Sequence, residues 1–460
     1  MKNIYRFLIF AALVTAITSC RKAEKLDVDY SSFNADHPET NTALDQWLRK
    51  NFLDAYNIDV VYRYNRYYHG NTANVTPNNL EDIQPTMEAV LEGFIAPYRK
   101  IAGETFSKKY IPKEFVLFGS YSYADSNDPG VAGTAAAGRR ITLYGLNDYA
   151  PLPGGAFYFW DRQRIMHHEF GHILNQIIPI PTDFESISKG YYKQPYKDTP
   201  IDSAHKNGFV TSYASGVYTE DYAESISWLL INGQAWYDNW ANTASAAGKR
   251  RLILKEQNVI NYFSSLGINF KELQKEMQMY MRNKLNLNES KFPYWLNEKI
   301  YSSMTLNPES ASSIKYGNSA AFLQVYNAVK TGISGMNGYG FKLNFIKVNF
   351  SSATKMNVEV NFSQGTNTFL ANYAYDMAVN QATGEVKFTT GTPEGTGHPW
   401  VGNASLLKPA VQPLLDYLSN QVFIADWIPV TVDADNYMKY AGFSVKGSPA
   451  NYFYGPLALN

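Results

Sequence analysis

The spacing of apolar residues changes near residue 305 of this 460-residue chain. Before that point, apolar residues recur mainly every three or four positions, which is typical of amphipathic helices. The helices that this spacing predicts are 41–57, 79–102 and 249–285. Short runs rich in β-branched and aromatic residues predict strands at 59–63, 115–118 and 140–145. The first 300 residues therefore combine several helices with a few short strands.

After about residue 305, apolar and polar residues alternate, which is the pattern of half-buried strands. The strands predicted from this alternation are 341–350, 356–362, 373–379 and 386–389, and one helical interruption is expected near 406–418. Thr383-Gly384 is expected to form the hairpin turn before the last of these strands. No motif in this region carries chemistry. We predict a β-rich C-terminal domain over residues 305–460.

The first twenty residues have the pattern of a bacterial export signal. Two basic residues precede an apolar run at 7–17, which is too short to span a bilayer. Cys20 is the single cysteine of the chain and follows a small residue, as in a lipobox. We expect a lipoprotein signal peptide at 1–19, a lipid on Cys20 and a tether over 20–40. Ordinary signal cleavage, without lipid, is the alternative.

The strongest functional signal is the pentapeptide at residues 168–172, His-Glu-Phe-Gly-His. In a helix, His168 and His172 project from one face, which suits two nitrogens that bind one zinc ion. Glu169 then lies beside the metal and can take a proton from a zinc-bound water. With 7 His and 41 acidic residues in the chain, chance alone gives only about 0.01 such matches. The alternative is a surface helix with two solvated histidines.

The residues around this motif predict a helix. Asp161 is a candidate N-cap, and Pro179 is expected to end the helix. Gly171 is a poor helix former, so we expect close packing against a neighbouring segment there. His167 faces away from His168 and His172, and we expect it to pack or support the site rather than to bind metal.

A catalytic zinc ion usually has a third protein ligand. The metzincin continuation fails, because Asn175 and Ile178 stand where Gly and His are required. A second predicted helix opens with Glu220 and Glu224, which share a face at i and i+4. One of them can bind the metal while the other accepts a hydrogen bond from a ligating His. Alternatively, the two acids only complement the positive end of their helix. Other candidate ligands, with weaker context, are Asp183, Glu185, Asp202 and His205.

These motifs resemble those of known zinc peptidases. Glutamate zincins such as thermolysin take the third ligand from the first Glu of E-x-x-x-D, and Glu220 with Glu224 matches this pattern except for its last residue. The catalytic domain of anthrax lethal factor is more similar, because it has an HEFGH helix, an E-x-x-A-E helix and a catalytic Tyr seven residues before the ligand Glu. Tyr213 stands at that position. The resemblance implies that Tyr213 stabilises the oxyanion of the tetrahedral intermediate.

Longer stretches resemble the zinc-binding metallopeptidase lipoproteins of Bacteroidetes, often described as substrate-import-associated zinc metallohydrolases. The stretches are 44–47, 51–52, 56–63, 112–120, 168–172, 208–214 and 220–224. The resemblance covers about residues 40–295 and implies a zincin-like metallopeptidase domain over 41–300. Such a domain combines a small mixed sheet with active-site helices. The expected fold class is therefore α+β, with the β-rich domain behind it.

The resemblance also assigns roles. One zinc ion is bound by His168, His172 and Glu220, and Glu169 passes the water proton to the leaving amine. Glu224 orients a zinc-bound histidine. In this superfamily an edge strand near the zinc pairs with the substrate backbone, and residues 141–144 are the candidate. The alternative is that 141–144 form an internal strand.

The chain carries 41 basic and 41 acidic residues, and this zero net charge argues against nucleic acid as a partner. The resemblance implies a peptide or protein substrate, an outer-membrane lipid anchor and exposure at the cell surface. It also implies a role in nutrient import beside a TonB-dependent transporter and a SusD-like lipoprotein. The alternative is a non-catalytic or pseudoenzyme binding lipoprotein of an outer-membrane import complex. The intact Glu169 favours the enzyme, because a structural zinc site needs no general base.

Overall fold

The computed structural model describes residues 42–125, 130–428 and 433–460. The predicted signal peptide, Cys20 and the whole tether lie outside these residues. The described residues fall into two compact units, which meet between Asn51 and Phe52 in the sequence. In the first unit, helix α2 (Ala43–Leu48) begins with a capping box between Thr42 and Asp45. The predicted domain boundaries at 40, 300 and 305 stay predictions.

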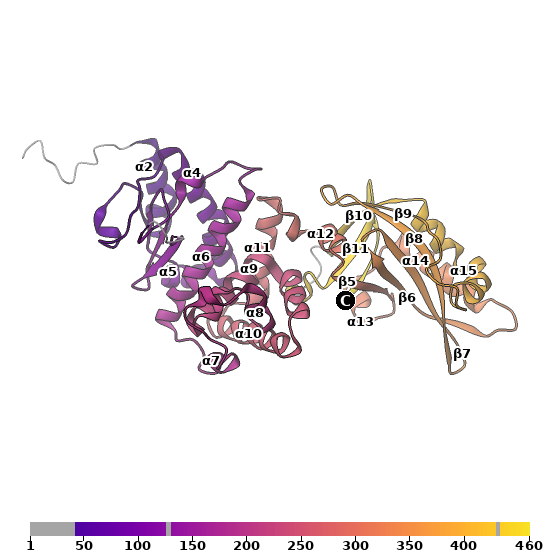
Figure 1. Cartoon of the computed structure of the whole chain (residues 1–460). Helices are drawn as coiled ribbons and strands as arrows, with labels where there is room; N and C mark the ends of the chain where they lie inside the picture. Colours follow the sequence, from indigo (N-terminus) through magenta and orange to yellow (C-terminus); the bar gives the residue numbers. More distant parts are fainter. Residues whose placement is uncertain (1–41, 126–129, 429–432) are drawn as a thin grey trace, which may run out of the picture. The chain divides into compact units, whose positions relative to one another are not determined.

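A small four-stranded sheet lies in the first half of the second unit (Figure 1). Its strands, in spatial order, are β1 (Asp59–Val61), β2 (Glu114–Leu117), β4 (Arg140–Leu143) and β3 (Gly133–Ala136). The pairs β1–β2 and β2–β4 are parallel, whereas β3 runs antiparallel to β4. The sheet is therefore mixed, as expected. Residues 141–144 fall on the internal strand β4 and on the residue after it, so the expectation that they form the edge strand is wrong. The edge strand beside β4 is β3.

Helices cover this sheet and build the rest of the region before residue 300. Helix α6 (Ala156–Ile177) carries the HEFGH motif and lies beside α9 (Tyr218–Thr243), as Figure 1 shows. The other helical segments are η2 (Arg49–Leu53), α3 (Asp54–Tyr56), η3 (Arg66–Tyr68), α4 (Leu80–Val90), η4 (Leu91–Ile95), α5 (Ala96–Tyr110), η5 (Leu146–Asp148), α7 (Phe184–Ile187), η6 (Tyr196–Asp198), α8 (Ile201–Lys206), η7 (Tyr213–Ser215), α10 (Ala246–Ser265), α11 (Phe270–Asn283), η8 (Asn288–Ser290) and α12 (Phe292–Asn297).

The predicted helix 249–285 is in fact two helices, α10 and α11. Gly267 between them has φ 77°, a left-handed conformation that suits glycine at the end of a helix. Asn269 then accepts hydrogen bonds from the backbone N–H groups of Lys271 and Glu272 and caps α11. The apolar spacing continued through this turn, so periodicity alone did not reveal the break.

The remaining strands form a closed eight-stranded barrel, which confirms the β-rich character of the C-terminal region. The strands are β5 (Tyr301–Leu306), β6 (Phe341–Ser352), β7 (Lys355–Gln364), β8 (Asn367–Val379), β9 (Glu385–Thr390), β10 (Val422–Trp427), β11 (Tyr440–Val445) and β12 (Ser448–Leu459). The spatial order is β10-β11-β12-β5-β6-β7-β8-β9, and β10 pairs with β9 to close the barrel. Alternate residues such as Val358, Val360 and Phe362 are buried, as the sequence pattern required.

Helices also belong to this β-rich region. They are α13 (Ala311–Tyr316), α14 (Ala320–Ser334) and α15 (Gly402–Ser419), with the short turn η9 (Ala434–Asn436). The expectation of a single helical interruption is therefore wrong, because the short α13 was missed, and so was α14. Its buried residues Phe322, Tyr326, Val329 and Ile333 do have helical spacing. Among the described residues, no helix is both long enough and apolar enough to cross a membrane.

Candidate active site

Helix α6 presents the HEFGH residues to the interior of the molecule, where His168 and Glu169 are both buried. The helix begins at Ala156, after Gly155, so the prediction that Asp161 caps it is wrong. Asp161 instead pairs with Arg164 at 2.8 Å within the helix. The earlier start is favoured by apolar packing, since Tyr158 and Phe159 in the added turns are buried. The helix ends at Ile177, two residues before Pro179, as expected.

Close contact between α6 and α9 brings the two halves of the site together. A Cβ atom added to Gly171 would lie 3.4 Å from the Cα atom of Ala223 on α9. The absence of a side chain at Gly171 therefore lets the two helix backbones approach each other. Ala223 lies between Glu220 and Glu224, so this contact places both carboxylates beside the histidines.

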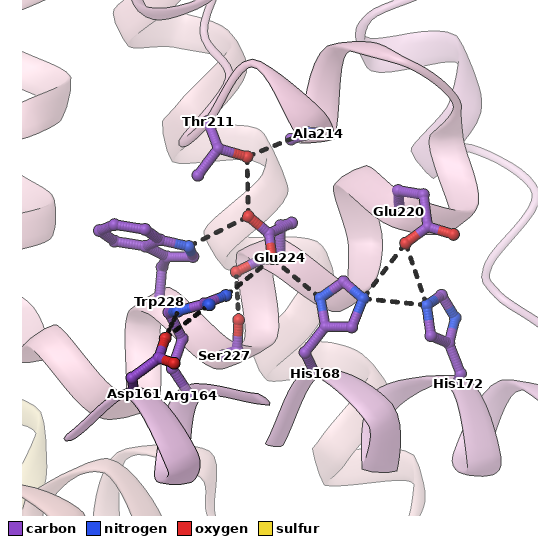
Figure 2. Close-up of polar contacts among 10 residues, drawn as sticks. All are labelled: Asp161, Arg164, His168, His172, Thr211, Ala214, Glu220, Glu224, Ser227 and Trp228. Atoms are coloured by element: carbon purple, nitrogen blue, oxygen red, sulfur yellow. Dashed lines mark hydrogen bonds and ion pairs between the residues drawn. The ribbon is translucent and has the colours of Figure 1, made fainter. Parts of the chain in front are cut away.

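Three side chains meet at one point (Figure 2). The Nε2 atoms of His168 and His172 are 3.1 Å apart, and Oε2 of Glu220 lies 3.2 Å from the first and 3.1 Å from the second. Two atoms that each bind a tetrahedral zinc ion at roughly 2.0–2.1 Å are about 3.3–3.4 Å apart. The donor set of two imidazoles and one carboxylate, at this spacing, fits zinc. The structure thus brings together the three predicted ligands.

The charges around this triangle favour a cation. Burial lowers the pKa of His168, but its hydrogen bonds to Glu220 and Glu224 outweigh burial and raise the pKa to about 10. Burial raises the pKa of Glu220, but hydrogen bonds to His168 and His172 outweigh it and hold that pKa well below its usual range. A positive charge at the meeting point of these side chains is therefore stabilised by carboxylates that stay ionised.

Glu224 does not belong to the triangle; it contacts His168 on the side of the ring that faces away from His172 (Figure 2). Its Oε1 atom is 2.9 Å from Nδ1 of His168, the nitrogen that points away from the triangle. Its Oε2 atom accepts hydrogen bonds from Thr211 Oγ1 at 2.7 Å and from the Trp228 indole N–H at 3.1 Å. Burial alone would raise the pKa of Glu224, but its hydrogen bond to His168 and the charges nearby lower it. An ionised Glu224 holds His168 with Nε2 directed at the triangle.

Glu169 lies next to the edge strand of the small sheet. A Cβ atom added to Gly133 of β3 would be 3.2 Å from Cγ of Glu169 and 2.4 Å from the Ile165 side chain. The backbone of β3 therefore passes, at the edge of the sheet, close to the face of α6 that carries Glu169. Burial raises the pKa of Glu169, and the two neighbouring histidines lower it by less. A carboxylate with a raised pKa is a stronger proton acceptor than one in water.

Tyr213 lies in η7, next to His168. Its ring centroid is 5.9 Å from that of His168 and 4.9 Å from that of Tyr196. The side chain is 38% exposed, so it can meet a substrate. Burial and the nearby carboxylate of Glu220 raise the pKa of Tyr213 far above its usual range. The hydroxyl is therefore protonated at neutral pH and can donate a hydrogen bond.

The alternative ligands lie away from the triangle. Asp183 accepts a hydrogen bond from Asn258, and His205 bonds the carbonyl of Trp240 at 2.7 Å. Asp202 and Glu185 are exposed side chains. His167 is buried against Tyr98, and burial lowers its pKa to about 3, so it is a neutral packing residue. The structure therefore groups none of these with His168 and His172.

A cavity of about 500 Å³, which we call the active-site cavity, is lined by His168 and Glu169 of α6. Besides the predicted residues, it is lined by side chains that sequence reasoning missed, namely Trp160, Arg164, Tyr196, Thr211 and Trp228. Thr211 belongs to one of the stretches that resemble the metallopeptidase lipoproteins, which was the only signal for it in the sequence. No signal in the sequence marks the other four, because only the folding of the chain brings them to the cavity.

One solved structure and one family of proteins are similar to this chain. A solved structure described as "a putative zinc-binding metallo-peptidase from Bacteroides caccae" is 26% identical to this chain, with a TM-score of 0.44. The similarity covers 54% of this chain and 94% of that one. Comparison with curated proteins gives no match. The sequence model of one family matches residues 37–271, a range that contains the whole triangle, Glu169 and Tyr213. The chain belongs to this family, which is described as "Putative zinc-binding metallo-peptidase".

Proposed function

We propose that this protein is a zinc-dependent metallopeptidase of the glutamate-zincin type, with one zinc ion held by His168, His172 and Glu220. The observation that carries the proposal is the triangle of three donor atoms 3.1–3.2 Å apart, with a buried glutamate next in sequence to one of them. Its membership of a zinc-binding metallopeptidase family supports the same activity. When bound, the zinc ion would polarise the scissile carbonyl and lower the pKa of a water ligand.

Glu169 is the general base of the proposed reaction. It takes a proton from the attacking water and passes it to the nitrogen of the leaving amine. Its burial and raised pKa suit both steps, because the same group must accept and then release the proton near neutral pH. A site with a purely structural ion has no use for a buried carboxylate at this position. Glu169 therefore favours the peptidase over a binding protein without catalysis.

Two further groups position and stabilise the substrate. Tyr213 keeps its proton at neutral pH and donates a hydrogen bond to the oxyanion of the tetrahedral intermediate. The edge strand β3 offers backbone N–H and C=O groups to an extended peptide, as sheet edges commonly do. Both lie beside the cavity lined by His168 and Glu169, where the scissile bond would bind.

We also propose that the protein acts at the cell surface, held in the outer membrane by a lipid on Cys20. The pattern of the first twenty residues supports an exported, lipid-anchored protein. Peptide cleavage at that place would serve nutrient import, with a TonB-dependent transporter and a SusD-like lipoprotein as partners. Labelling of Cys20 by a radioactive fatty acid in growing cells tests the anchor, and a Cys20→Ala variant should lose the label.

The peptidase activity is tested with the purified protein and a mixture of denatured proteins. Mass spectrometry of the products should reveal new peptide termini in the presence of zinc. A chelator should abolish them, and added zinc should restore them. Binding of the mixture without any cleavage, in protein that holds one zinc ion, would instead support the non-catalytic import component.

A further inference from the structure

A second cavity, of about 520 Å³, lies next to the active-site cavity and shares a wall with it. The shared wall is Trp160 of α6, which lines both cavities. The second cavity is lined mainly by apolar and aromatic side chains from α6, α9, α11, α12 and the segment between α11 and α12. They include Phe157, Trp236, Met281, Leu287, Tyr294 and Trp295. We call it the aromatic cavity.

The wall between the cavities is fixed in place by its neighbours. The indole N–H of Trp160 donates to Oδ1 of Asn232 at 3.2 Å. Its ring lies edge-on to Trp228 at 6.1 Å between centroids and stacks with Phe157 at 5.4 Å. Trp228 in turn lines the active-site cavity and is tied to Glu224, while Trp236 lies 4.9 Å beyond it. A row of aromatic rings thus leads from the catalytic site into the aromatic cavity.

The polar groups of the aromatic cavity are mostly used by the protein itself. Gln278 donates to the carbonyls of Leu230 and Ile231, and the Trp295 indole donates to the carbonyl of Glu289. Among the described residues that line this cavity, Glu289 alone carries a charge. The aromatic side chain of Phe157 also lines the cavity and is 72% exposed to solvent, which is unusual for a large aromatic residue. The lining therefore suits an apolar group and disfavours an acidic one.

The distance from His168 to the wall of the aromatic cavity matches a few residues of an extended peptide. Trp160 precedes His168 by two turns of α6, which is about 12 Å at 1.5 Å per residue. An extended chain advances roughly 3.3 Å per residue, so about three or four substrate residues span this distance.

We propose that the aromatic cavity is a specificity site, which binds a large aromatic or aliphatic side chain of the peptide substrate three or four residues from the scissile bond. The proposal rests on the proposed peptidase function. Phe157 and Trp236 are the residues that determine this specificity, and Trp160 separates the bound side chain from the catalytic groups.

The test begins with the cleavage sites of the zinc-loaded protein in a library of peptides from denatured proteins. Sites aligned on the cleaved bond should be enriched in Phe, Tyr, Trp, Leu or Ile at one position three or four residues away. For a peptide with Phe at that position and its Ala counterpart, the ratio of kcat/KM should be roughly tenfold to a hundredfold, mainly through KM. In Phe157→Ala and Trp236→Ala, the ratio should fall close to one. Because Phe157 is exposed, its variant should keep the melting temperature of the parent.

A matched control is Tyr67→Ala, which removes an aromatic ring that is 93% exposed and lies outside the lining of both cavities. It should keep the wild-type ratio. Efficient cleavage with no preference at these positions, or a preference that persists in both cavity variants, would overturn the proposal.

Failure of the peptidase function has a different result, namely no cleavage of any library peptide. The same Phe and Ala peptides can then be titrated against the zinc-loaded Glu169→Gln variant, with intrinsic tryptophan fluorescence as the readout. Tighter binding of the Phe peptide by tenfold or more, lost on adding Trp236→Ala, would retain the cavity as a peptide-binding site. Equal dissociation constants for the two peptides would overturn it.

Discussion

The region before residue 300 and the barrel after it differ in what they bury. Among the described residues, all buried ionisable side chains of the acidic, basic and histidine types belong to the first region: Asp82, Arg162, His167, His168, Glu169, Asp221, Glu224, Lys255 and Lys271. The buried polar residues of the barrel region are uncharged, namely Ser303, Ser313, Ser319, Asn357 and Asn403. A buried charge is unfavourable unless it is paired and hydrogen-bonded.

The difference indicates a division of tasks. The barrel is stabilised by apolar packing, with fully buried residues such as Met304, Ile346 and Phe388. The first region contains charges whose burial lowers stability, and the pairing of one of them, Glu224, orients the proposed metal ligand His168. We therefore expect substitutions of buried charges to change metal binding and catalysis, and substitutions in the barrel core to change stability alone.

The largest effect is expected for Glu169→Gln. The amide keeps the shape of the side chain but cannot accept the water proton, so kcat should fall by about three powers of ten or more. The zinc content should be unchanged. Glu185→Gln, at an exposed glutamate, is the matched control and should keep full activity. Near-normal turnover of Glu169→Gln would remove the general base from the proposed mechanism.

Tyr213→Phe should have the next largest effect on catalysis. Loss of one donor to the oxyanion typically lowers kcat about a hundredfold to a thousandfold. Because the ring remains, KM should change much less than kcat. Steady-state kinetics on one cleaved peptide measure both, and Tyr191→Phe on the surface serves as the control. A kcat equal to that of the parent would show that Tyr213 has no part in the chemical step.

One pair of variants compares the two regions directly. Lys255 is fully buried and lies 2.7 Å from Asp221, the residue after Glu220. Lys255→Met leaves Asp221 buried without its cation and should cost about 3–5 kcal/mol. Phe388→Ala in the barrel should cost a similar amount, about 3–5 kcal/mol, by leaving a cavity. Denaturant unfolding measures both costs.

Zinc affinity should separate these two variants. Lys255→Met should weaken zinc binding, because Asp221 and Glu220 share the first turn of α9. Phe388→Ala should bind zinc as the parent does, under conditions in which both remain folded. Equal loss of zinc in the two variants would show that the regions do not differ in the way described above.

The smallest effect is a pH-dependent change in stability at Asp238. Burial raises the pKa of Asp238 to about 6, above the value near 3.9 of an unfolded chain. A raised folded-state pKa means that ionisation opposes folding as the pH rises from about 4 through 6. Asp238→Asn should therefore stabilise the protein by about 1–2 kcal/mol at pH 7.5 and have little effect at pH 4. A melting temperature that changes equally at both pH values would contradict this assignment.

Residues close together in sequence were the most predictable part of the site. The spacing of His168, Glu169 and His172 alone predicts a zinc-binding helix, because one helical turn sets their geometry. Glu220 required a second helix and a family resemblance, since nothing local specifies which distant acid meets the histidines. The close contact at Gly171 was predicted from its low helix propensity, and the structure confirms it.

The elements that were not predicted depend on tertiary contacts. Strand β3 consists of Gly, Thr and two Ala residues. Gly and Ala are depleted in strands, so it is the pairing with β4 that makes this segment a strand. The edge of the sheet was therefore assigned to the wrong segment. Likewise, Trp160, Trp228 and Trp236 lie at helical spacings that also suit an ordinary core. Only the packing of α6 against α9 shows that they border the two cavities.

The most direct test of the central claim is the zinc content of the purified protein, wild type beside Glu220→Ala and the exposed-site control Glu185→Ala. The account predicts about one zinc ion per chain in the wild type and the control, and a marked loss in Glu220→Ala. An absence of zinc from the wild type after reconstitution, or undiminished zinc in Glu220→Ala, would contradict the three-ligand site.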